Sequence, residues 1–166
     1  MKAIAQRLTE FVQTHLPTAR ALRIRVADYD GQSLTLRAPL GPSVNDKQTA
    51  FGGSLYVVAV MAGWGMVYLR CREAGIDPNI VVVRGEIDYL APVAEDIVAV
   101  SMPAGEDDWA RFFRDFEERG KARMALRVEV PRGAEAAVVF QGVYAIVGLA
   151  SELDQGKPGR PSQSSL

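Results

Sequence analysis

Apolar and polar residues alternate with a period of two along much of the chain, which predicts an antiparallel sheet with one solvated face. The alternation is clearest at 122–130, and the apolar segment 138–147 follows it. Shorter strands are expected at 22–26, 34–38, 80–90 and 97–102. Within 80–90, we expect one face to carry Val81, Val83, Ile87 and Tyr89 and the other Arg84, Glu86 and Asp88.

Three segments instead show the spacing of helices. Ile4, Leu8, Phe11 and Val12 predict a first helix that Pro17 ends. Asp30-Gly31 predicts a two-residue hairpin between the first two strands. The last helix begins at the acidic triplet 106–108 and ends at Gly120, with an aromatic row expected to pack on the sheet: Trp109, Phe112, Phe113 and Phe116.

The middle helix is apolar on every side. Residues 50–69 contain no charged side chain, and the helix runs from about Leu55 to about Ala74, with Gly75 after it. A membrane span is one interpretation of such a run, although its helical part, 55–69, is short for crossing a bilayer. The other interpretation is a helix that is buried on every side. A curved antiparallel sheet wrapped around one long apolar helix is an α+β hot-dog fold, and that is the fold we expect.

Composition narrows the functional class. The 166 residues include 19 Lys or Arg against 20 Asp or Glu, a balance that argues against nucleic acid as a partner. A single cysteine and an N-terminus without a signal-peptide core favour the cytoplasm. We expect one domain over 1–150, followed by a disordered polar tail at 151–166.

The residues that could take part in catalysis or binding cluster where a polar loop precedes the middle helix. Asn45 and Asp46 lie in this loop, and Gly52-Gly53 follow at the start of the helix. A helix N-terminus offers unpaired N–H groups, and glycine lets a ligand approach them. A carbonyl oxygen could therefore find an oxyanion hole there. The alternative is structural: Asn45-Asp46 form an Asx turn and the glycines relieve crowding.

The chain resembles the YiiD-type C-terminal thioesterase-like family, whose members are hot-dog domains found alone or fused behind a GNAT-type acetyltransferase. The resemblance covers about residues 3–148, and we expect the stand-alone form here. It rests on these motifs: Asn45-Asp46-Lys47-x-Thr49-x-Phe51-Gly52-Gly53-Ser54, Ala62-Gly63-Trp64-Gly65, Ile87-x-Tyr89-x-x-Pro92-Val93, Gly120-Lys121-Ala122-Arg123 and Gly142-x-Tyr144.

The wider hot-dog thioesterases imply roles for these residues. Many carry His-Gly-Gly at the helix start, an upstream Asn, and an acidic residue two turns into the helix. Here Phe51 replaces the histidine, and apolar residues at 60–62 replace the acid. We therefore expect Asp46 to activate water, Asn45 to orient the carbonyl or the water, and the amides of Gly52 and Gly53 to polarise the carbonyl.

Other polar candidates favour structural roles. His15 is expected to be an exposed cap at the end of the first helix, and Ser54 an N-cap or first-turn hydroxyl instead of a nucleophile. Cys71 is expected to be an inert core thiol. Glu86 and Asp88 share a face with Arg84, which favours a solvated or dimer-edge ladder.

Together these inferences predict a cytoplasmic homodimer that hydrolyses an acyl thioester of coenzyme A or of an acyl carrier protein. No metal or other cofactor is expected, and no membrane partner. The acyl chain would pass Phe51, Tyr56 and Trp64, with Ser54 beside the carbonyl site. The alternative function is a non-catalytic acyl-CoA or acyl-carrier binding or regulatory module.

Overall fold

The computed structural model describes residues 2–102 and 104–149, so the expected tail at 151–166 lies outside the described residues. Its elements are α1 (Lys2–His15), α2 (Pro17–Ala21), β1 (Arg25–Tyr29), β2 (Leu34–Ala38), α3 (Gly52–Glu73), β3 (Pro78–Tyr89), β4 (Ile97–Ser101), α4 (Glu106–Arg119), β5 (Lys121–Arg132) and β6 (Glu135–Leu149). A short 3₁₀ turn spans Gly41–Ser43.

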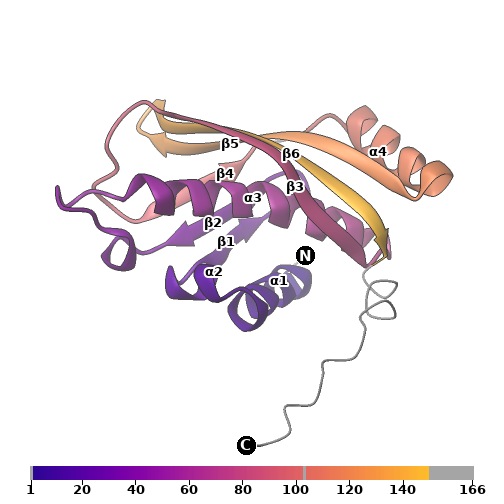
Figure 1. The fold of residues 1–166 in the computed structure, drawn as a ribbon, viewed down its shortest axis with the longest axis horizontal. Helices are drawn as coiled ribbons and strands as arrows, with labels where there is room; N and C mark the ends of the chain where they lie inside the picture. Colours follow the sequence, from indigo (N-terminus) through magenta and orange to yellow (C-terminus); the bar gives the residue numbers. More distant parts are fainter. Residues whose placement is uncertain (1, 103, 150–166) are drawn as a thin grey trace, which may run out of the picture.

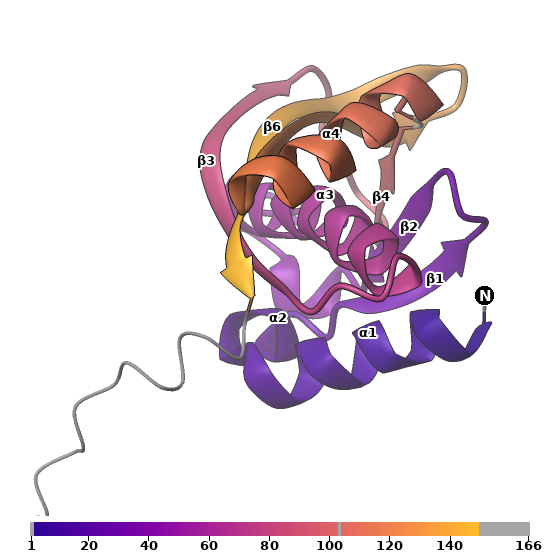
Figure 2. The same ribbon diagram turned by 90° about the vertical axis from the view of Figure 1, so that its right-hand side faces the viewer.

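The strands form one antiparallel sheet in the order β1-β2-β4-β5-β6-β3. The sheet curves around α3, which runs along its concave side (Figure 1). Seen along the helix, α3 lies between the sheet and α1 (Figure 2). This arrangement confirms the predicted α+β hot-dog fold.

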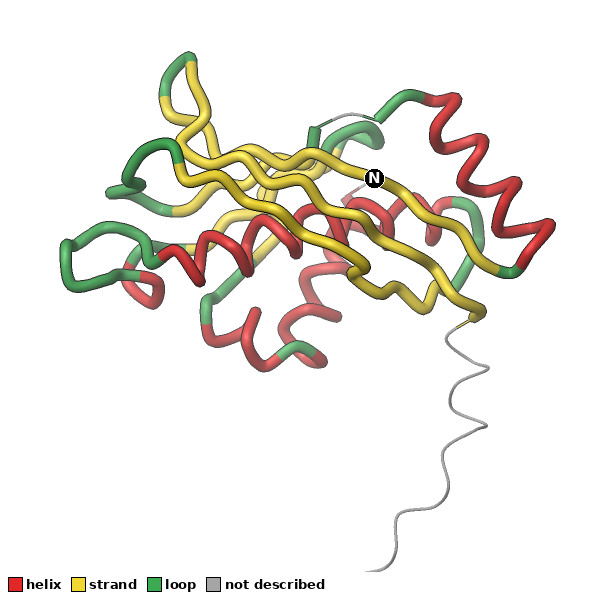
Figure 3. The backbone as a smooth tube through the Cα atoms, turned by 45° about the horizontal axis from the view of Figure 1, so that its top comes forward, coloured by secondary structure: helices red, strands yellow, loops and turns green. Residues whose placement is uncertain are grey.

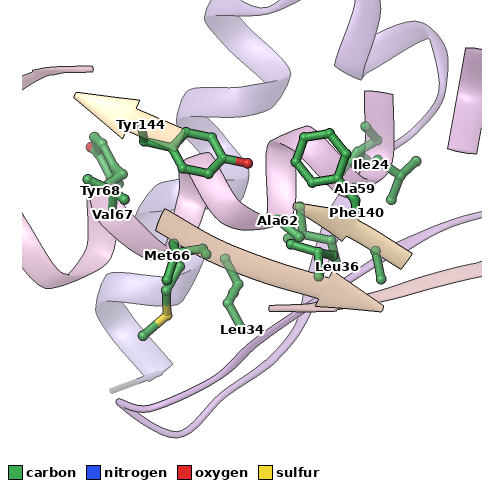
Figure 4. Close-up of a cluster of buried hydrophobic side chains, with 14 of the residues drawn as sticks. Ile24, Leu34, Leu36, Ala59, Ala62, Met66, Val67, Tyr68, Phe140 and Tyr144 are labelled. Atoms are coloured by element: carbon green, nitrogen blue, oxygen red, sulfur yellow. The ribbon is translucent and has the colours of Figure 1, made fainter. Parts of the chain in front are cut away.

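The apolar character of α3 is explained by burial. The helix contacts β2, β3, β4, β5, β6 and α1, and the side chains at its centre are fully buried. Figure 4 shows Ala62, Met66 and Val67 of α3 among side chains from several strands, including Leu34, Phe140 and Tyr144. By length and composition α3 could cross a membrane, but 61% of its most apolar 18-residue window is buried inside this fold.

Of two local predictions near the N-terminus, one was confirmed and the other was wrong. Pro17 does end α1, but it also begins α2, since proline fits the first position of a helix. The connection between β1 and β2 has four residues, 30–33, and not two. The Asp30 carboxylate accepts hydrogen bonds from the amides of Gln32 and Ser33, and this side-chain bonding shapes the longer turn.

The predicted faces of β3 hold only over part of the strand. Ile87 pairs with buried Phe140 and packs against the core on the concave face of the sheet. A register shift between Val82 and Arg84 inserts one extra residue, which reverses the alternation toward the start of β3. Val81 therefore lies in one row with Ala145 and exposed Arg123, on the convex face of the sheet.

The sheet has two opposite ends that matter for function. α3 begins beside the end of β3, where the Tyr89 hydroxyl donates a 2.9 Å hydrogen bond to the carbonyl of Gly52. The start of β3, the start of β5 and α4 lie together at the other end (Figures 1 and 3). Gly120 ends α4 in the left-handed conformation and leads directly into β5, as predicted.

Candidate active site at the N-terminus of α3

Where α3 begins, three backbone amides have no hydrogen-bond acceptor among the described residues. Phe51 is the N-cap residue, and no side chain caps this helix. The first helical hydrogen bond joins the Leu55 amide to the Phe51 carbonyl at 3.0 Å. Within the described chain, the amides of Gly52, Gly53 and Ser54 therefore have no hydrogen-bond acceptor. These N–H groups, with the positive end of the helix dipole, form the donor set that an anionic oxygen requires.

The preceding loop is held rigidly against this helix end. The Asn45 carboxamide oxygen accepts hydrogen bonds from the amides of Lys47 at 2.8 Å and Thr49 at 3.1 Å. Its nitrogen donates to the Thr49 hydroxyl at 3.0 Å. The structure therefore contains the Asx turn that the sequence left open as an alternative. The Asn45 side chain is therefore engaged in hydrogen bonds within the loop.

Two further backbone contacts fix the same loop. The Ala50 amide donates to the carbonyl of Val93 at 2.7 Å, and the Phe51 amide donates to the carbonyl of Ser43 at 2.7 Å. The first contact gives a structural reason for the Pro92-Val93 motif, because this segment anchors the chain immediately before α3.

Asp46 is exposed at the tip of this turn. Its carboxylate makes no hydrogen bond or ion pair with other described residues. No other acidic side chain lies in the loop or in the first two turns of α3, so Asp46 remains the carboxylate nearest in sequence to the unpaired amides.

Phe51 and Tyr89 flank the glycine pair. A Cβ on Gly53 would overlap Cε1 of Phe51 and lie 3.1 Å from Cδ1, whereas a Cβ on Gly52 would make ordinary 3.5 Å contacts with the Tyr89 ring. Phe51 is 58% exposed, and Tyr89 and Leu90 are 51% and 63% exposed. The helix end is therefore surrounded by apolar surface that is open to solvent.

Tyr89 is a site residue that sequence reasoning did not single out. Desolvation raises the pKa of its phenol, with a smaller contribution from Tyr56, so the hydroxyl remains a neutral donor. Its signal was present in the Ile87-x-Tyr89 motif: a large aromatic residue at the end of a strand, with no strand beyond it to cover it.

The structure does not gather all the expected substrate contacts. Tyr56 packs edge-on against Phe140 beneath β3 and β6, near Gly85. Trp64 stacks on Phe11 of α1 and on Tyr68, at ring-centroid distances of 5.8 and 5.3 Å. Trp64 thus lies on the side of α3 that faces α1, three turns from the helix start, whereas Ser54 is buried in the first turn.

The other polar candidates occupy structural positions. His15 is exposed at the end of α1, where its ring stacks on Phe11 and Nδ1 lies 3.2 Å from the Phe11 carbonyl oxygen. Cys71 is fully buried, and burial raises the pKa of its thiol to about 12. Glu86 and Asp88 are exposed, and Glu86 pairs with Arg84. In the described part of the chain, no three His, Cys, Asp or Glu side chains are grouped as a metal site would require.

The fold and the site together define the structural class: a hot-dog domain whose central helix begins with amides that have no acceptor among the described residues. A family model described as "putative thioesterase (yiiD_Cterm)" matches residues 5–148, and the chain belongs to this family. The resemblance inferred from the motifs is therefore confirmed.

Solved structures share the fold of this chain. A protein "with unknown function" from Chlorobaculum tepidum TLS is 42% identical, with a TM-score of 0.85 over 89% of this chain and 96% of that one. A "putative thioesterase" from Shewanella oneidensis is 28% identical, with a TM-score of 0.79 over 89% and 99%. A thioesterase from Haemophilus influenzae shares the fold at 13% identity, with a TM-score of 0.65 over 88% and 92%.

Proposed function

We propose that this protein hydrolyses acyl thioesters at the N-terminus of α3. The observation that carries the proposal is the set of unpaired amides at Gly52, Gly53 and Ser54, on a helix with no capping side chain. Membership of a thioesterase family supports thioester substrates. Each amide aimed at the developing oxyanion would lower the barrier by about 3 kcal/mol.

The reaction needs one base and one oxyanion site. Water adds to the carbonyl carbon while the Asp46 carboxylate accepts its proton, and the resulting oxyanion lies against the amides of the glycine pair. The carbon–sulfur bond then breaks, and Asp46 returns the proton to the departing thiolate. Asn45 takes part as a positioning residue, because its carboxamide holds the turn that carries Asp46.

We also propose that the working unit is a cytoplasmic homodimer joined along β3. This strand lies at one edge of the sheet, so one side of its backbone has no partner strand in the described chain. Exposed apolar side chains gather on it: Val81, Val82, Val83 and Tyr89. Pairing with a second copy would satisfy the unpaired backbone groups of this edge. Light scattering of the purified protein should give twice the chain mass, and a monomer at micromolar concentration would refute the dimer.

The catalytic assignment is tested with variants of the loop. Asp46→Asn should lower kcat on the best acyl-CoA of a chain-length series by about 10²- to 10⁴-fold with an unchanged Tm. Lys47→Gln is the matched control, because it changes the charge of the neighbouring exposed residue and should leave kcat unchanged. Asn45→Ala should lower both Tm and kcat, since it removes the bonds that hold the turn.

Gly53→Ala tests the oxyanion site separately. The new methyl group would displace the Phe51 ring and narrow the approach to the amides, so kcat/KM should fall more than for Gly52→Ala, whose methyl group fits beside Tyr89. Wild-type kcat in Asp46→Asn would exclude Asp46 as the base, and Glu86 and Asp88 would then be the next carboxylates to test.

A second function is supported by one observation: residues 60–62 of α3 are apolar where related enzymes carry an acid. In this alternative, the protein binds acyl-CoA or an acyl carrier protein without turnover. Tight binding by calorimetry together with no release of thiol would favour it.

A further inference from the structure

A groove on the convex face of the sheet carries cations that form no ion pair within the described residues. It lies between the end of α4 and the starts of β3 and β5, with a volume of about 450 Å³. We call it the α4–β5 groove. Its lining includes Val81, Val83, Arg119, Lys121, Arg123 and Val147. Lys121 and Arg123 belong to the Gly120-Lys121-Ala122-Arg123 motif, to which the proposed reaction assigns no role.

The cations of this groove differ from other cations on the same sheet face. Arg84 pairs with Glu86 and Arg127 pairs with Glu129, so a carboxylate balances the charge of each of these two arginines. Lys121 and Arg123 make no ion pair or side-chain hydrogen bond with the described residues. The one carboxylate in the lining, Asp115, lies 3.8 Å from Arg119.

Apolar side chains line the same groove beside these cations. The register shift in β3 turns Val81 and Val83 to the convex face, and Val147 lies opposite Lys121 on β6. A ligand for this surface would carry several negative charges together with a flat or apolar group. The nucleotide of coenzyme A, which bears three phosphates on an adenosine, has this chemistry.

The position of the groove indicates which subunit's α3 N-terminus would lie near it in a dimer. β3 has 12 residues, so its two ends lie about 36 Å apart along the strand at about 3.3 Å per residue. Within one chain, the groove is at the start of β3 and the N-terminus of α3 is at its end. Antiparallel pairing of two copies about the middle of β3 would bring the start of this strand in one subunit beside Tyr89 of the other.

We propose that the α4–β5 groove binds the nucleotide phosphates of coenzyme A while the thioester reacts at the N-terminus of α3 in the other subunit. This inference rests on the proposed thioesterase function and on pairing through β3. The pantetheine arm would pass around the sheet end at Tyr89 and Leu90, from the concave face to the groove of the partner subunit. The substrate class is therefore acyl-CoA, in preference to a thioester of a carrier protein.

The test uses Lys121→Gln/Arg123→Gln in the full-length protein, with Arg127→Gln as the matched control from the same strand and the same face. KM for acyl-CoA should rise about tenfold or more in the double variant, with kcat unchanged. KM for the same acyl group on pantetheine, which lacks the nucleotide, should not change. In the wild type, KM for acyl-CoA should also rise with salt more steeply than in the double variant.

Several outcomes would overturn the proposal. An equal rise in KM for acyl-CoA and acyl-pantetheine would indicate a structural defect, and an unchanged KM for acyl-CoA would exclude the groove. A higher KM only for an acyl carrier protein thioester would make the groove a protein-docking surface instead.

Failure of hydrolysis is distinguishable from failure of the groove. If no thioester is turned over, calorimetry with free coenzyme A and with 3′-dephospho-coenzyme A measures the groove directly. Wild-type binding that weakens without the 3′-phosphate and is lost in the double variant would support the groove alone. Absence of coenzyme A binding by the wild type would overturn it.

Mixed dimers test the exchange between subunits. One subunit carries Gly53→Ala, first verified as inactive by itself, and the other carries the double groove variant. If groove and helix end come from different subunits, one of the two sites in the mixed dimer is intact and shows the wild-type KM for acyl-CoA. If they come from one subunit, no site with the wild-type KM remains, and the assignment across the interface is wrong.

Discussion

Replacing Gly63 with alanine should destabilise the protein through one identifiable contact. Gly63 lies on the buried side of α3, and a Cβ there would overlap the hydroxyl of Tyr144 and approach two of its ring carbons at 2.5 and 2.6 Å. Tyr144 is completely buried among core side chains (Figure 4), so its ring has little space into which it can move. Its hydroxyl donates a 2.9 Å hydrogen bond to the Val60 carbonyl of α3.

The expected cost follows from three contributions. Overpacking of a filled core costs about 1–3 kcal/mol. Loss of the Tyr144 hydrogen bond adds about 1 kcal/mol. Alanine recovers about 0.5–1 kcal/mol relative to glycine within a helix. The net loss in the free energy of unfolding should be about 2 kcal/mol, which corresponds to a fall in Tm of about 4–8 °C for a domain of this size.

Urea unfolding of a double-mutant cycle measures this coupling. In a Tyr144→Leu background the overlap is absent, so Gly63→Ala should cost close to nothing there or be slightly stabilising. Gly52→Ala provides a control on the same helix, because its Cβ meets the Tyr89 ring at an ordinary 3.5 Å. Equal costs of Gly63→Ala in the two backgrounds would show that contact with Tyr144 is not the cause.

Two further predictions follow from buried and charged groups. The Cys71 thiol, with a pKa raised by burial to about 12, should react with a disulfide reagent only after unfolding in guanidinium, and immediate reaction in native buffer would contradict its burial. The Leu40 amide and then Arg37 hold the pKa of Asp96 below its ordinary 3.8. Asp96 should therefore stabilise the fold at neutral pH and lose this contribution as pH falls through its lowered pKa. Asp96→Asn should lower the urea midpoint at pH 7, and the midpoints of the two proteins should converge as pH falls through the lowered pKa of Asp96.

The sequence was sufficient to predict the fold because its strongest patterns all indicate one arrangement. Alternation specified β2 and β5, and the charge-free run specified a helix that only complete burial can accommodate. The alternation predicted for β3 was wrong at Val81 and Val83, because a bulge adds one residue without changing the local composition. Such a bulge depends on how β3 pairs with β6, and that pairing is not encoded within the strand itself.

The candidate site was likewise predictable from the sequence only in part. The glycine pair and its helix end were predictable, since adjacent glycines at the start of an apolar helix form a local signal. The positions of Tyr89 and Trp64 were not, because each depends on a long-range contact: Tyr89 with the Gly52 carbonyl, and Trp64 with Phe11 of α1. The local sequence around an aromatic residue in an apolar helix does not indicate whether its side chain points toward the site or toward another element.

The bulge links the two proposed halves of the site. Without it, the predicted alternation would turn Val81 and Val83 toward the concave face, and the convex α4–β5 groove would lose two of its apolar walls. The same extra residue leaves Ile87 facing the core, so the end of β3 still presents Tyr89 to the start of α3. One strand can therefore present a surface for a nucleotide at its start and contribute to a carbonyl site at its end, on opposite faces of the sheet. A two-fold axis through the middle of β3 would bring those two ends together, which is why the dimer and the groove stand as linked hypotheses.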